Sequence, residues 1–316
     1  MILVYIETAE GKAKNVGLEM LTAAKIISDK AVAVLIGTGN DEAVKQAASY
    51  GADEVITVEN AVYSTDAYCY IMKSLVEKYS PEAVFVGSTL DGKDFAPRLA
   101  AQLGTGCVTD VVNIKVEDGK AVYTCPSYNG NLLNDMTAEA SPVVAIIRSG
   151  SFKKADPAEK EVNVIAESIA VPADEIRTKI AETVKEISET VNLEEADVIV
   201  SGGRGMGAPE NFALVKELAD LLGGVVGATR APIESGWISR AHQIGQSGKI
   251  VAPKLYIACG ISGATQHVSG MIGSDYIVAI NKDEDAPIFD IANVGIVGNV
   301  LEVLPLMIEE IKKARA

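Results

Sequence analysis

Two short segments in the last third of the chain combine residues that are suited to binding an anion. Gly245-Gln246-Ser247-Gly248-Lys249 places two glycines, a hydroxyl and a cation within five residues. Glycines allow backbone N–H groups to turn toward an anion, and a lysine can neutralise it. Ser262-Gly263-Ala264 precedes a predicted helix, whose first N–H groups and positive dipole end favour an anion. Two such turns, one predicted strand apart, indicate a dinucleotide cofactor; two ordinary loops are the alternative interpretation.

Glycine or polar residues also end the other strands predicted for this half of the chain. Ligands of α/β domains usually bind beyond the carboxyl ends of parallel strands, and these ends meet at one edge of the sheet. Their clustering there favours a nucleotide-like ligand more strongly than either loop alone. The five segments are 201–205, 227–230, 245–249, 260–263 and 281–283.

Three long polar side chains in these segments are candidates for contacts with such a ligand. Arg204 lies in a glycine-rich turn, where it could reach a phosphate or a ring edge; a surface arginine is the alternative. Arg230 could stack on or donate to a cofactor ring, or instead form an interdomain salt bridge. His267 could donate to a ring carbonyl or lie on a helix surface. No Ser/His/acid or Cys/His set can be assembled, so no catalytic residue is predicted.

The composition limits the class of protein. A chain of 316 residues predicts about two domains. Apolar residues make up 48%, mostly Val, Ile and Ala, and aromatic residues only 5%, which suits parallel strands buried on both faces. The net charge of −15 argues against a nucleic-acid or anionic-membrane surface.

The cysteines and the apolar runs bear on metal binding and location. The four cysteines are scattered without a Cys-x-x-Cys pair, and there are only two histidines, so no metal site is predicted. Free buried thiols in a reducing cytoplasm are the expected state. No apolar run approaches the ~20 residues that span a bilayer, so no membrane insertion is expected. The sequence begins directly with a predicted strand, and we expect no signal or import peptide.

Strand-like and helical patterns alternate through the first 105 residues. Such alternation is typical of βαβ units and a parallel sheet. Gly87-Ser88-Thr89 and Gly92-Lys93-Asp94 are predicted to form a loop after one strand, with a helix over Phe95–Leu103. The predicted strands are Ile2–Ile6, Ala31–Ile36, Glu54–Val58 and Ala83–Val86, and the other helical stripes lie within Leu18–Ile27, Ala43–Ala48 and Tyr68–Val76.

The pattern then changes twice. Val111–Val116, Lys120–Thr124 and Val143–Arg148 predict an antiparallel extension of the sheet. Ala173–Val191 predicts a charged helix or linker, after which strand and helix patterns start again and end in a helix beginning within Gly295–Val300. We therefore predict an α/β protein with two mainly parallel doubly wound sheets. The domains are 1–191, an N-terminal α/β domain, and 192–316, a Rossmann-like nucleotide-binding domain.

Together, the motifs of the second half closely resemble the alpha subunit of the electron transfer flavoprotein. The first half agrees more loosely, and the resemblance covers nearly the whole chain. The motifs that carry it are Ser201-Gly202-Gly203-Arg204-Gly205, Gly227-Ala228-Thr229-Arg230, Gln243-Ile244-Gly245-Gln246-Ser247-Gly248-Lys249, Gly260-Ile261-Ser262-Gly263-Ala264-Thr265-Gln266-His267 and Ala279-Ile280-Asn281-Lys282-Asp283.

The resemblance implies an FAD held mainly by residues 192–316. By similarity, Arg230 would lie over the flavin and Ser247 near its N5 atom, with Gln266 and His267 at the ribityl group and the pyrimidine side. Ser247 stands where many relatives have threonine, and Asn299 replaces a frequent aspartate, so that contact loses a charge. The implied FAD contacts are Arg204, Thr229, Arg230, Ile244, Gly245, Gln246, Ser247, Ser262, Gly263, Ala264, Thr265, Gln266, His267, Asn281, Asn299 and Val300.

The resemblance also implies how such a chain works. Arg230 and His267 would favour the anionic reduced forms of the flavin, because opposite charges attract strongly in a partly buried site. An electron carrier in a heterodimer is implied, with residues 1–191 at the interface. The beta subunit would hold AMP or a second FAD, and an acyl-CoA dehydrogenase or another flavoprotein would be the redox partner. The alternatives are a subunit of an NADH-oxidising electron-bifurcating complex and a nucleotide-binding regulatory subunit.

Overall fold

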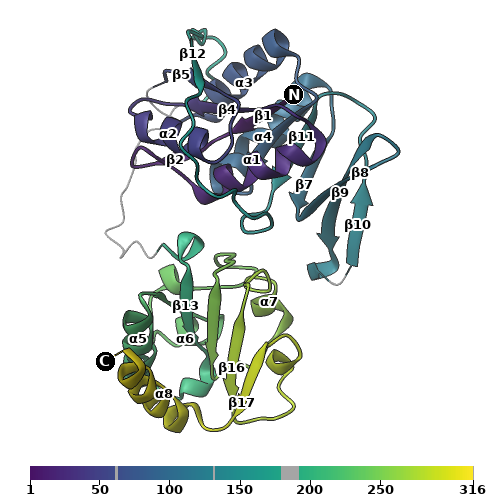
Figure 1. The fold of residues 1–316 in the computed structure, drawn as a ribbon. Helices are drawn as coiled ribbons and strands as arrows, with labels where there is room; N and C mark the ends of the chain where they lie inside the picture. The colour runs from purple at the N-terminus through teal and green to yellow at the C-terminus, as the bar shows by residue number, and fades with distance from the viewer. Residues whose placement is uncertain (61–62, 131, 179–191, 316) are drawn as a thin grey trace. The chain divides into compact units, whose positions relative to one another are not determined.

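The computed structural model describes residues 1–60, 63–130, 132–178 and 192–315, which form two compact units, one before and one after residues 179–191 in the sequence (Figure 1). The predicted boundary between residues 191 and 192 therefore adjoins a stretch outside the described residues. Most of the helix or linker predicted for Ala173–Val191 also lies outside them. Its described part, residues 173–178, forms a turn and irregular chain instead of a helix.

The first unit is built on a seven-stranded sheet in which all neighbouring strands are parallel. The strands are apolar and mostly buried on both faces, and every residue of Ala31–Ile36 is buried. The prediction of a parallel doubly wound sheet is thus confirmed. In spatial order the strands are β12 (Asn163–Glu167), β5 (Glu54–Val58), β4 (Ala31–Ile36), β1 (Ile2–Tyr5), β6 (Ala83–Gly87), β11 (Val143–Ile147) and β7 (Cys107–Val111).

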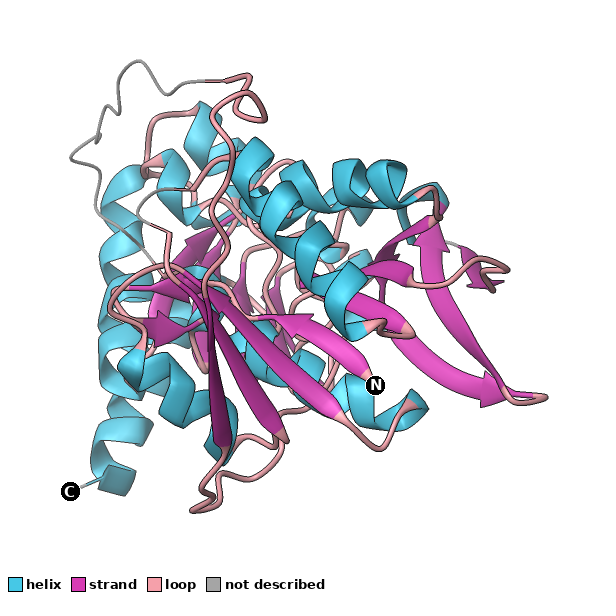
Figure 2. Cartoon of the chain, turned by 90° about the horizontal axis from the view of Figure 1, so that it is seen from above, coloured by secondary structure: helices cyan, strands magenta, loops and turns pink. Residues whose placement is uncertain are grey.

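Helices cover both faces of this sheet (Figure 2). Helices α1 (Asn15–Ile27) and α2 (Asp41–Ser49) pack over one face, and α3 (Thr65–Tyr79) and α4 (Leu90–Leu103) over the other. Each face has its own buried apolar core, because alternate residues of a strand point to opposite sides of the sheet.

Helix α4 begins five residues earlier than the sequence pattern indicated. Gly92-Lys93-Asp94 was predicted as a loop, but it lies in the first turn of α4, where the Thr89 hydroxyl accepts the Gly92 N–H at 3.1 Å. A Cβ atom at Gly92 would lie 2.0 Å from the Gly87 carbonyl oxygen. Glycine is needed here because the helix packs directly on the end of β6, and not because the chain forms a loop.

An antiparallel sheet of β8 (Asn113–Glu117), β9 (Lys120–Ser127) and β10 (Leu132–Met136) confirms part of the predicted extension. The assignment of Val143–Arg148 to it was wrong, because β11 lies between β6 and β7 in the parallel sheet. Its residues alternate between the two apolar cores, as a central strand requires. The edge strand β12 and the short pair β2 (Thr8–Ala9) and β3 (Lys12–Ala13) were not predicted from the sequence.

The second unit contains a five-stranded sheet that is also entirely parallel. Its edge strand β17 occupies part of the stretch predicted to begin the last helix, which starts only at Val300. A Cβ at Gly295 in β17 would lie 2.7 Å from the Phe289 ring, so this glycine provides packing space in a strand. In spatial order the strands are β14 (Val225–Ala228), β13 (Val198–Gly202), β15 (Leu255–Cys259), β16 (Ile277–Asn281) and β17 (Val294–Val297).

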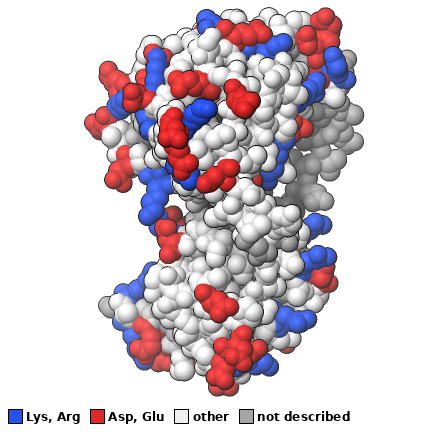
Figure 3. Space-filling model, turned by 90° about the vertical axis from the view of Figure 1, so that its right-hand side faces the viewer, with Lys and Arg blue, Asp and Glu red and all other residues white. Residues whose placement is uncertain are grey.

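Two long helices, α5 (Phe212–Leu222) and α8 (Val300–Arg315), lie side by side against this sheet (Figure 1). The short helices α6 (Arg230–Glu234) and α7 (Thr265–Val268) follow β14 and β15. Among the described helices, none is both long and apolar enough to cross a membrane. On the face drawn in Figure 3, acidic and basic side chains are intermixed.

Candidate cofactor-binding site

A cavity of about 740 Å³ lies at the carboxyl ends of the strands in the second unit. It is centred where the strand order reverses, because β13 is followed by β14 on one side and by β15 on the other. This is the usual ligand position of an open parallel sheet. The residues that line it are Gly203, Arg204, Gly205, Thr229, Arg230, Ala231, Gln243, Ile244, Gly245, Gln246, Ser247, Gly260, Ile261, Ser262, Ala264, Gln266, His267, Asn281, Lys282 and Asp283.

Three glycines let the loops after β13 and β15 meet backbone to backbone. A Cβ at Gly203 would lie 2.3 Å from the Gly260 carbonyl oxygen, and one at Gly205 would lie 2.7 Å from the Gly260 Cα. The Gly205 N–H also donates to the Gly260 carbonyl at 2.9 Å. Any side chain here would push the two loops apart, so the glycines fix the floor of the cavity.

The segment 243–249 is a loop and not the end of a regular strand, which corrects one of the five predicted strand ends. The Gln243 side-chain amide donates to the Ser247 Oγ at 3.0 Å, and the Gln246 N–H donates to the Gln266 carbonyl at 2.7 Å. Gly245 has a φ of 136°, and a Cβ there would lie 2.7 Å from the same carbonyl. These contacts hold the loop against α7 and turn residues 244–247 toward the cavity.

The charged groups of the lining are mostly positive. Arg204, Arg230 and Lys282 line the cavity with one acidic residue, Asp283. The Arg230 Nε donates to Glu234 Oε1 at 2.6 Å within helix α6, and both side chains are more than 60% exposed. An excess of cations around a cavity favours an anionic ligand such as a phosphate.

Asn281 joins two of the loops through its side-chain amide. Its Nδ2 donates to the Ile261 carbonyl at 2.9 Å, and its Oδ1 accepts the Asp283 N–H at 3.0 Å. With both ends of the amide used inside the chain, Asn281 shapes the cavity by holding the loops after β15 and β16 together.

His267 is buried and neutral, which corrects the expectation that it brings a positive charge to the site. Burial lowers the pKa of His267 to about 4, although its hydrogen bond to Ile244 opposes this shift. Its Nδ1 lies 3.0 Å from the Ile244 carbonyl oxygen, and its Nε2 lies 3.0 Å from the Tyr256 hydroxyl. Both ring nitrogens therefore have partners within the chain, and Arg230 is left as the candidate for a positive charge near a bound ring.

Twelve of the sixteen residues predicted to contact FAD line the cavity. Gly263 and Thr265 belong to the same loop and the start of α7 without lining it. Asn299 and Val300 are not brought to the cavity. Val300 is the first residue of α8 and is buried in the core, and the Asn299 Oδ1 accepts the Leu301 N–H at 3.1 Å at the start of that helix.

Eight lining residues were absent from the predicted set. The glycines among them could have been recognised from their place beside Arg204 and before Ile261, and Gln243 from its place at the start of its motif. Ala231 and Ile261 carry no sequence signal of their own, since small apolar residues are common in any α/β domain. The eight are Gly203, Gly205, Ala231, Gln243, Gly260, Ile261, Lys282 and Asp283.

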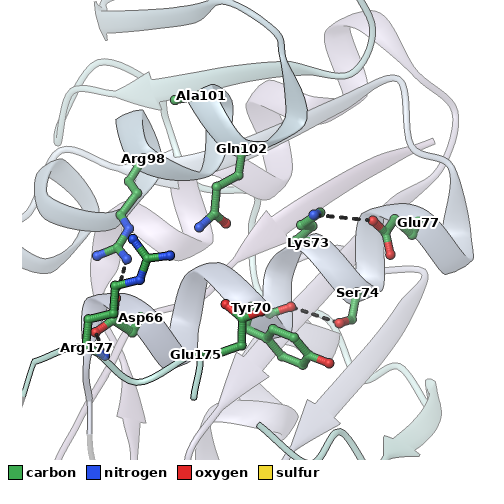
Figure 4. A pocket seen from close by; sticks show the side chains of 10 residues that line it. All are labelled: Asp66, Tyr70, Lys73, Ser74, Glu77, Arg98, Ala101, Gln102, Glu175 and Arg177. Carbon is green, nitrogen blue, oxygen red and sulfur yellow. Dashed lines mark hydrogen bonds and ion pairs between the residues drawn. The ribbon is translucent and has the colours of Figure 1, made fainter. Parts of the chain in front are cut away.

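A second cavity, of about 460 Å³, lies between α3 and α4 in the first unit (Figure 4). The Asp66 carboxylate at its edge is fully buried and pairs with Arg98. It also accepts the backbone N–H groups of Arg177 and Thr178 at 2.8 and 2.9 Å and the Thr178 hydroxyl at 3.0 Å. Burial alone would raise the pKa of Asp66, but these donors outweigh it and lower the pKa to about 2.

The lining of this second cavity is balanced in charge. Its cations are Lys73, Arg98 and Arg177, and its acids are Asp66, Glu77 and Glu175. A balanced set of charges has no preference for an anion, unlike the lining of the first cavity. We therefore place the functional site in the second unit.

Comparisons with known proteins agree with this placement. The model of the electron transfer flavoprotein domain matches residues 2–172, and that of the electron transfer flavoprotein FAD-binding domain matches residues 192–272. The electron transfer flavoprotein subunit alpha of Thermoanaerobacterium thermosaccharolyticum is 45% identical, covering 99% of this chain and 98% of that protein. This chain belongs to the electron transfer flavoprotein alpha-subunit family.

Other relatives are similar over the same length. The subunit alpha of Bacillus subtilis is 41% identical, covering 99% of this chain and 97% of that protein. A protein from Anaerotignum propionicum named acryloyl-CoA reductase electron transfer subunit beta is 36% identical, and the match covers 99% of this chain and 96% of that protein. The matched FAD-binding domain includes most of the loops around the first cavity and assigns FAD as the cofactor of this unit.

The residues of the first cavity fit an FAD. A volume of about 740 Å³ lies within the usual range of ligand pockets, roughly 300–1,000 Å³. In the described part of the chain, the backbone N–H groups of Ser262, Ala264 and Gln266 donate to no acceptor, which leaves them for phosphate oxygens. Arg204 and Lys282 add positive charge for a pyrophosphate.

Proposed function

We propose that this chain is the FAD-holding subunit of an electron carrier, which accepts electrons from one redox protein and passes them to another. The observation that carries this proposal is the coincidence of the FAD-binding domain match with a cavity at the strand ends of the second unit. FAD supplies reversible uptake of one or two electrons. No substrate other than these electrons is needed, so we propose a carrier and not an enzyme with its own substrate.

The residues of the cavity divide the work of holding such a cofactor. We propose that the N–H groups of segment 262–266 and the cations Arg204 and Lys282 hold the phosphates. Arg230 supplies a positive charge to the ring and Ser247 a hydroxyl. Loop 243–249 is anchored through Gln243 and Gln246, so that these groups are held before the cofactor binds. The proposed FAD-binding domain begins at residue 192, where the family match begins.

The proposed partners are a beta subunit and a flavoprotein dehydrogenase. Relatives named as alpha subunits over nearly the full chain support a heterodimer, in which residues 1–191 contact the beta subunit. The likeness to an acryloyl-CoA reductase electron transfer subunit supports an acyl-CoA dehydrogenase or related enzyme as the redox partner. The four described cysteines are free, which supports the cytoplasm as the location.

Purification of the chain with its beta subunit tests the proposal. We expect a yellow complex whose bound FAD is reduced and reoxidised reversibly. Arg204→Ala should weaken FAD binding, whereas Arg240→Ala, an exposed arginine of the same unit outside the cavity, should not. A colourless complex, or equal FAD loss in both variants, would contradict the proposed site.

A second candidate function is an NADH-oxidising electron-bifurcating assembly with another FAD in the beta subunit. The likeness to the acryloyl-CoA reductase subunit favours this candidate. Counting the nucleotides released by denaturation separates the two functions: two FAD per heterodimer supports bifurcation, and one FAD with one AMP supports the simple carrier.

A further inference from the structure

Tyr256 is a fully buried polar side chain next to the proposed FAD site. It lies in the central strand β15, has no exposed surface, and does not line the cavity. Its hydroxyl group lies 3.0 Å from the Nε2 atom of His267. Since a buried hydroxyl is costly without a hydrogen-bond partner, this contact is expected to be maintained.

The partners of His267 determine where its proton lies. The Ile244 carbonyl oxygen can only accept, so the Nδ1 atom that lies 3.0 Å from it carries the hydrogen. The ring is neutral above pH 4, because burial lowers the pKa of His267 to about 4. Nε2 is then unprotonated and accepts the hydrogen of the Tyr256 hydroxyl. The Ile244 carbonyl thus selects one of the two neutral forms of the imidazole, and Tyr256 stabilises that form by donating to Nε2.

The Ile244 carbonyl connects this pair to the cavity. Ile244 is 2% exposed and belongs to the lining segment 243–247. The backbone of the segment is held against α7 through the Gln246 N–H, which donates to the Gln266 carbonyl next to His267. If the imidazole turned or changed its proton, Ile244 would lose its donor, and the loop would lose one of its hydrogen bonds to α7.

We propose that Tyr256 is a positioning residue of the cavity, which acts through His267 to hold loop 244–247 in the conformation that binds FAD. This inference rests on the proposed function, because it takes FAD as the ligand of the cavity. Tyr256 touches no ligand. It orients the histidine that anchors the loop, so its loss reaches the cofactor only through His267.

Nuclear magnetic resonance of the full chain tests the contact without FAD. The sequence contains two histidines, so labelling their rings with nitrogen-15 gives a simple spectrum. The signals that are missing from the spectrum of the His267→Gln variant belong to His267. In the wild type, we expect the His267 signals to show a neutral ring protonated at Nδ1 that does not titrate between pH 5 and 8. Tyr256→Phe should shift its Nε2 signal downfield, to the position of a nitrogen without a donor. Tyr276→Phe, a 45% exposed tyrosine of the same unit, should leave it unchanged.

FAD titration of the same full-length variants tests the positioning role. Tyr256→Phe should weaken FAD binding about tenfold, as expected for one lost buried hydrogen bond. In the His267→Gln background, Tyr256→Phe should have no further effect, because the two residues act in series. Tyr276→Phe should bind FAD like the wild type.

The remaining outcomes separate this role from the proposed function. A His267 signal that titrates near neutral pH in the wild type overturns the inference, whether or not any variant folds. If Tyr256→Phe shifts the Nε2 signal but leaves the FAD affinity unchanged, the contact exists but does not position the loop. If Tyr256→Phe weakens FAD binding equally in the wild type and in the His267→Gln variant, its effect is purely structural and does not act through His267. A wild-type chain that has the contact but binds no FAD, even with its beta subunit, rejects the proposed function, and the positioning role is rejected with it.

Discussion

Arg230 is a charged residue of the cavity that is paired with a neighbouring acid. Its Nε donates to Glu234 one helical turn later, so part of its charge is already balanced. Exposed pairs of this kind contribute roughly 0.2–1 kcal/mol. Glu234 therefore belongs among the residues that tune the proposed site, although it does not line the cavity.

This pairing predicts opposite effects of two substitutions on the flavin potential. Glu234→Gln should raise the two-electron midpoint potential by roughly 5–20 mV, because it leaves Arg230 more positive and favours the added electrons. Arg230→Ala should lower the potential. Redox titration of the FAD-loaded heterodimer measures both. Glu217→Gln is the control, an acid of the same unit that pairs with Lys312 outside the cavity. A downward shift in Glu234→Gln, or one equal to the control, would disprove the coupling.

His267 predicts how the stability of the second unit depends on pH. Its pKa is about 4 in the folded chain and about 6.5 in an unfolded one, so the unfolded state binds the proton first as the pH falls. The contribution of neutral His267 to the stability of the folded chain is complete above pH 6.5. It is lost as the pH falls toward 4, and the loss is about 3 kcal/mol at most. Trp237, the only tryptophan, packs on Phe212, and its fluorescence reports unfolding of this unit. The stability of the His267→Gln variant should fall less steeply over this pH range than that of the wild type. Parallel stability curves for the two proteins would contradict the assignment.

At the scale of elements, the parallel strands could be predicted because their sequences are apolar on both faces. The errors concern elements whose place depends on contacts with other parts of the chain. Val143–Arg148 was assigned to the antiparallel extension because it follows a hairpin in the sequence. Only the packing of the alternate residues of β11 into two cores shows that this strand belongs to the parallel sheet. Gly92 and Gly295 were taken as signs of a loop and a helix start. Both are glycines because another group lies too close for a side chain, which the sequence does not reveal.

The cavity could be predicted where a motif lies at the end of a strand, and less well elsewhere. Arg204, Thr229 and Ser262 line it as expected. Asn299 and Val300 do not, because the start of α8 uses the Asn299 side chain and buries Val300. Tyr256 gave no signal, since an aromatic residue in a buried strand is ordinary and its hydroxyl partner lies eleven residues away.

Helix α1 carries a second buried acid that links an element to a loop. Glu19 is 8% exposed, and its Oε2 accepts the Gly150 N–H at 2.7 Å. Burial raises the pKa of Glu19 to about 7, although Gly150 and the charge of Lys154 oppose the shift. The folded chain thus prefers protonated Glu19. The contribution of the protonated acid to the stability of the fold is complete below pH 4.5 and is lost as the pH rises through 7.

Glu19→Gln should therefore stabilise the chain at pH 8, by roughly 3 kcal/mol at most, because glutamine resembles the protonated acid. At pH 4.5 the variant and the wild type should be equally stable. Urea unfolding followed by circular dichroism at both pH values measures the difference. Glu161→Gln, an exposed acid of the same unit, serves as the control. A gain at pH 4.5 that equals the gain at pH 8 would show that the effect is not one of protonation.

At the scale of the whole molecule, the two units use the same sheet design with different results at the strand ends. In the second unit, the crevice beside the first strand β13 is the cavity floored by three glycines. In the first unit, the corresponding crevice beside β1 is bridged, because the Thr89 hydroxyl after β6 donates to Glu7 after β1. Lys14 also pairs with Glu7. An acid bridged in this way offers no site for a phosphate, which explains why one unit of this chain carries the cofactor.

A buried carboxylate helps to hold the last described residues of the first unit. Asp66 accepts the N–H groups of Arg177 and Thr178 and the Thr178 hydroxyl. It also accepts the Arg98 guanidinium, as Figure 4 shows. The peptide bond between Arg177 and Thr178 is thus tied to helix α3 on both sides. A bond held in this way resists a protease, because cleavage requires the chain to leave its partners and extend.

Asp66→Asn should release this bond. The asparagine cannot accept from all four donors, and it leaves Arg98 without its countercharge, so the contact should weaken by roughly 3 kcal/mol. Trypsin cleaves after arginine, and cutting between Arg177 and Thr178 should become on the order of 100-fold faster, as mass spectrometry of timed digests can measure. Asp174→Asn, an exposed acid in the same segment, is the matched control and should leave the rate unchanged. Cleavage after Lys153 and Lys154 in the same digests provides the internal reference. Equal rates after Arg177 in the wild type and Asp66→Asn would show that the carboxylate does not hold this end of the unit.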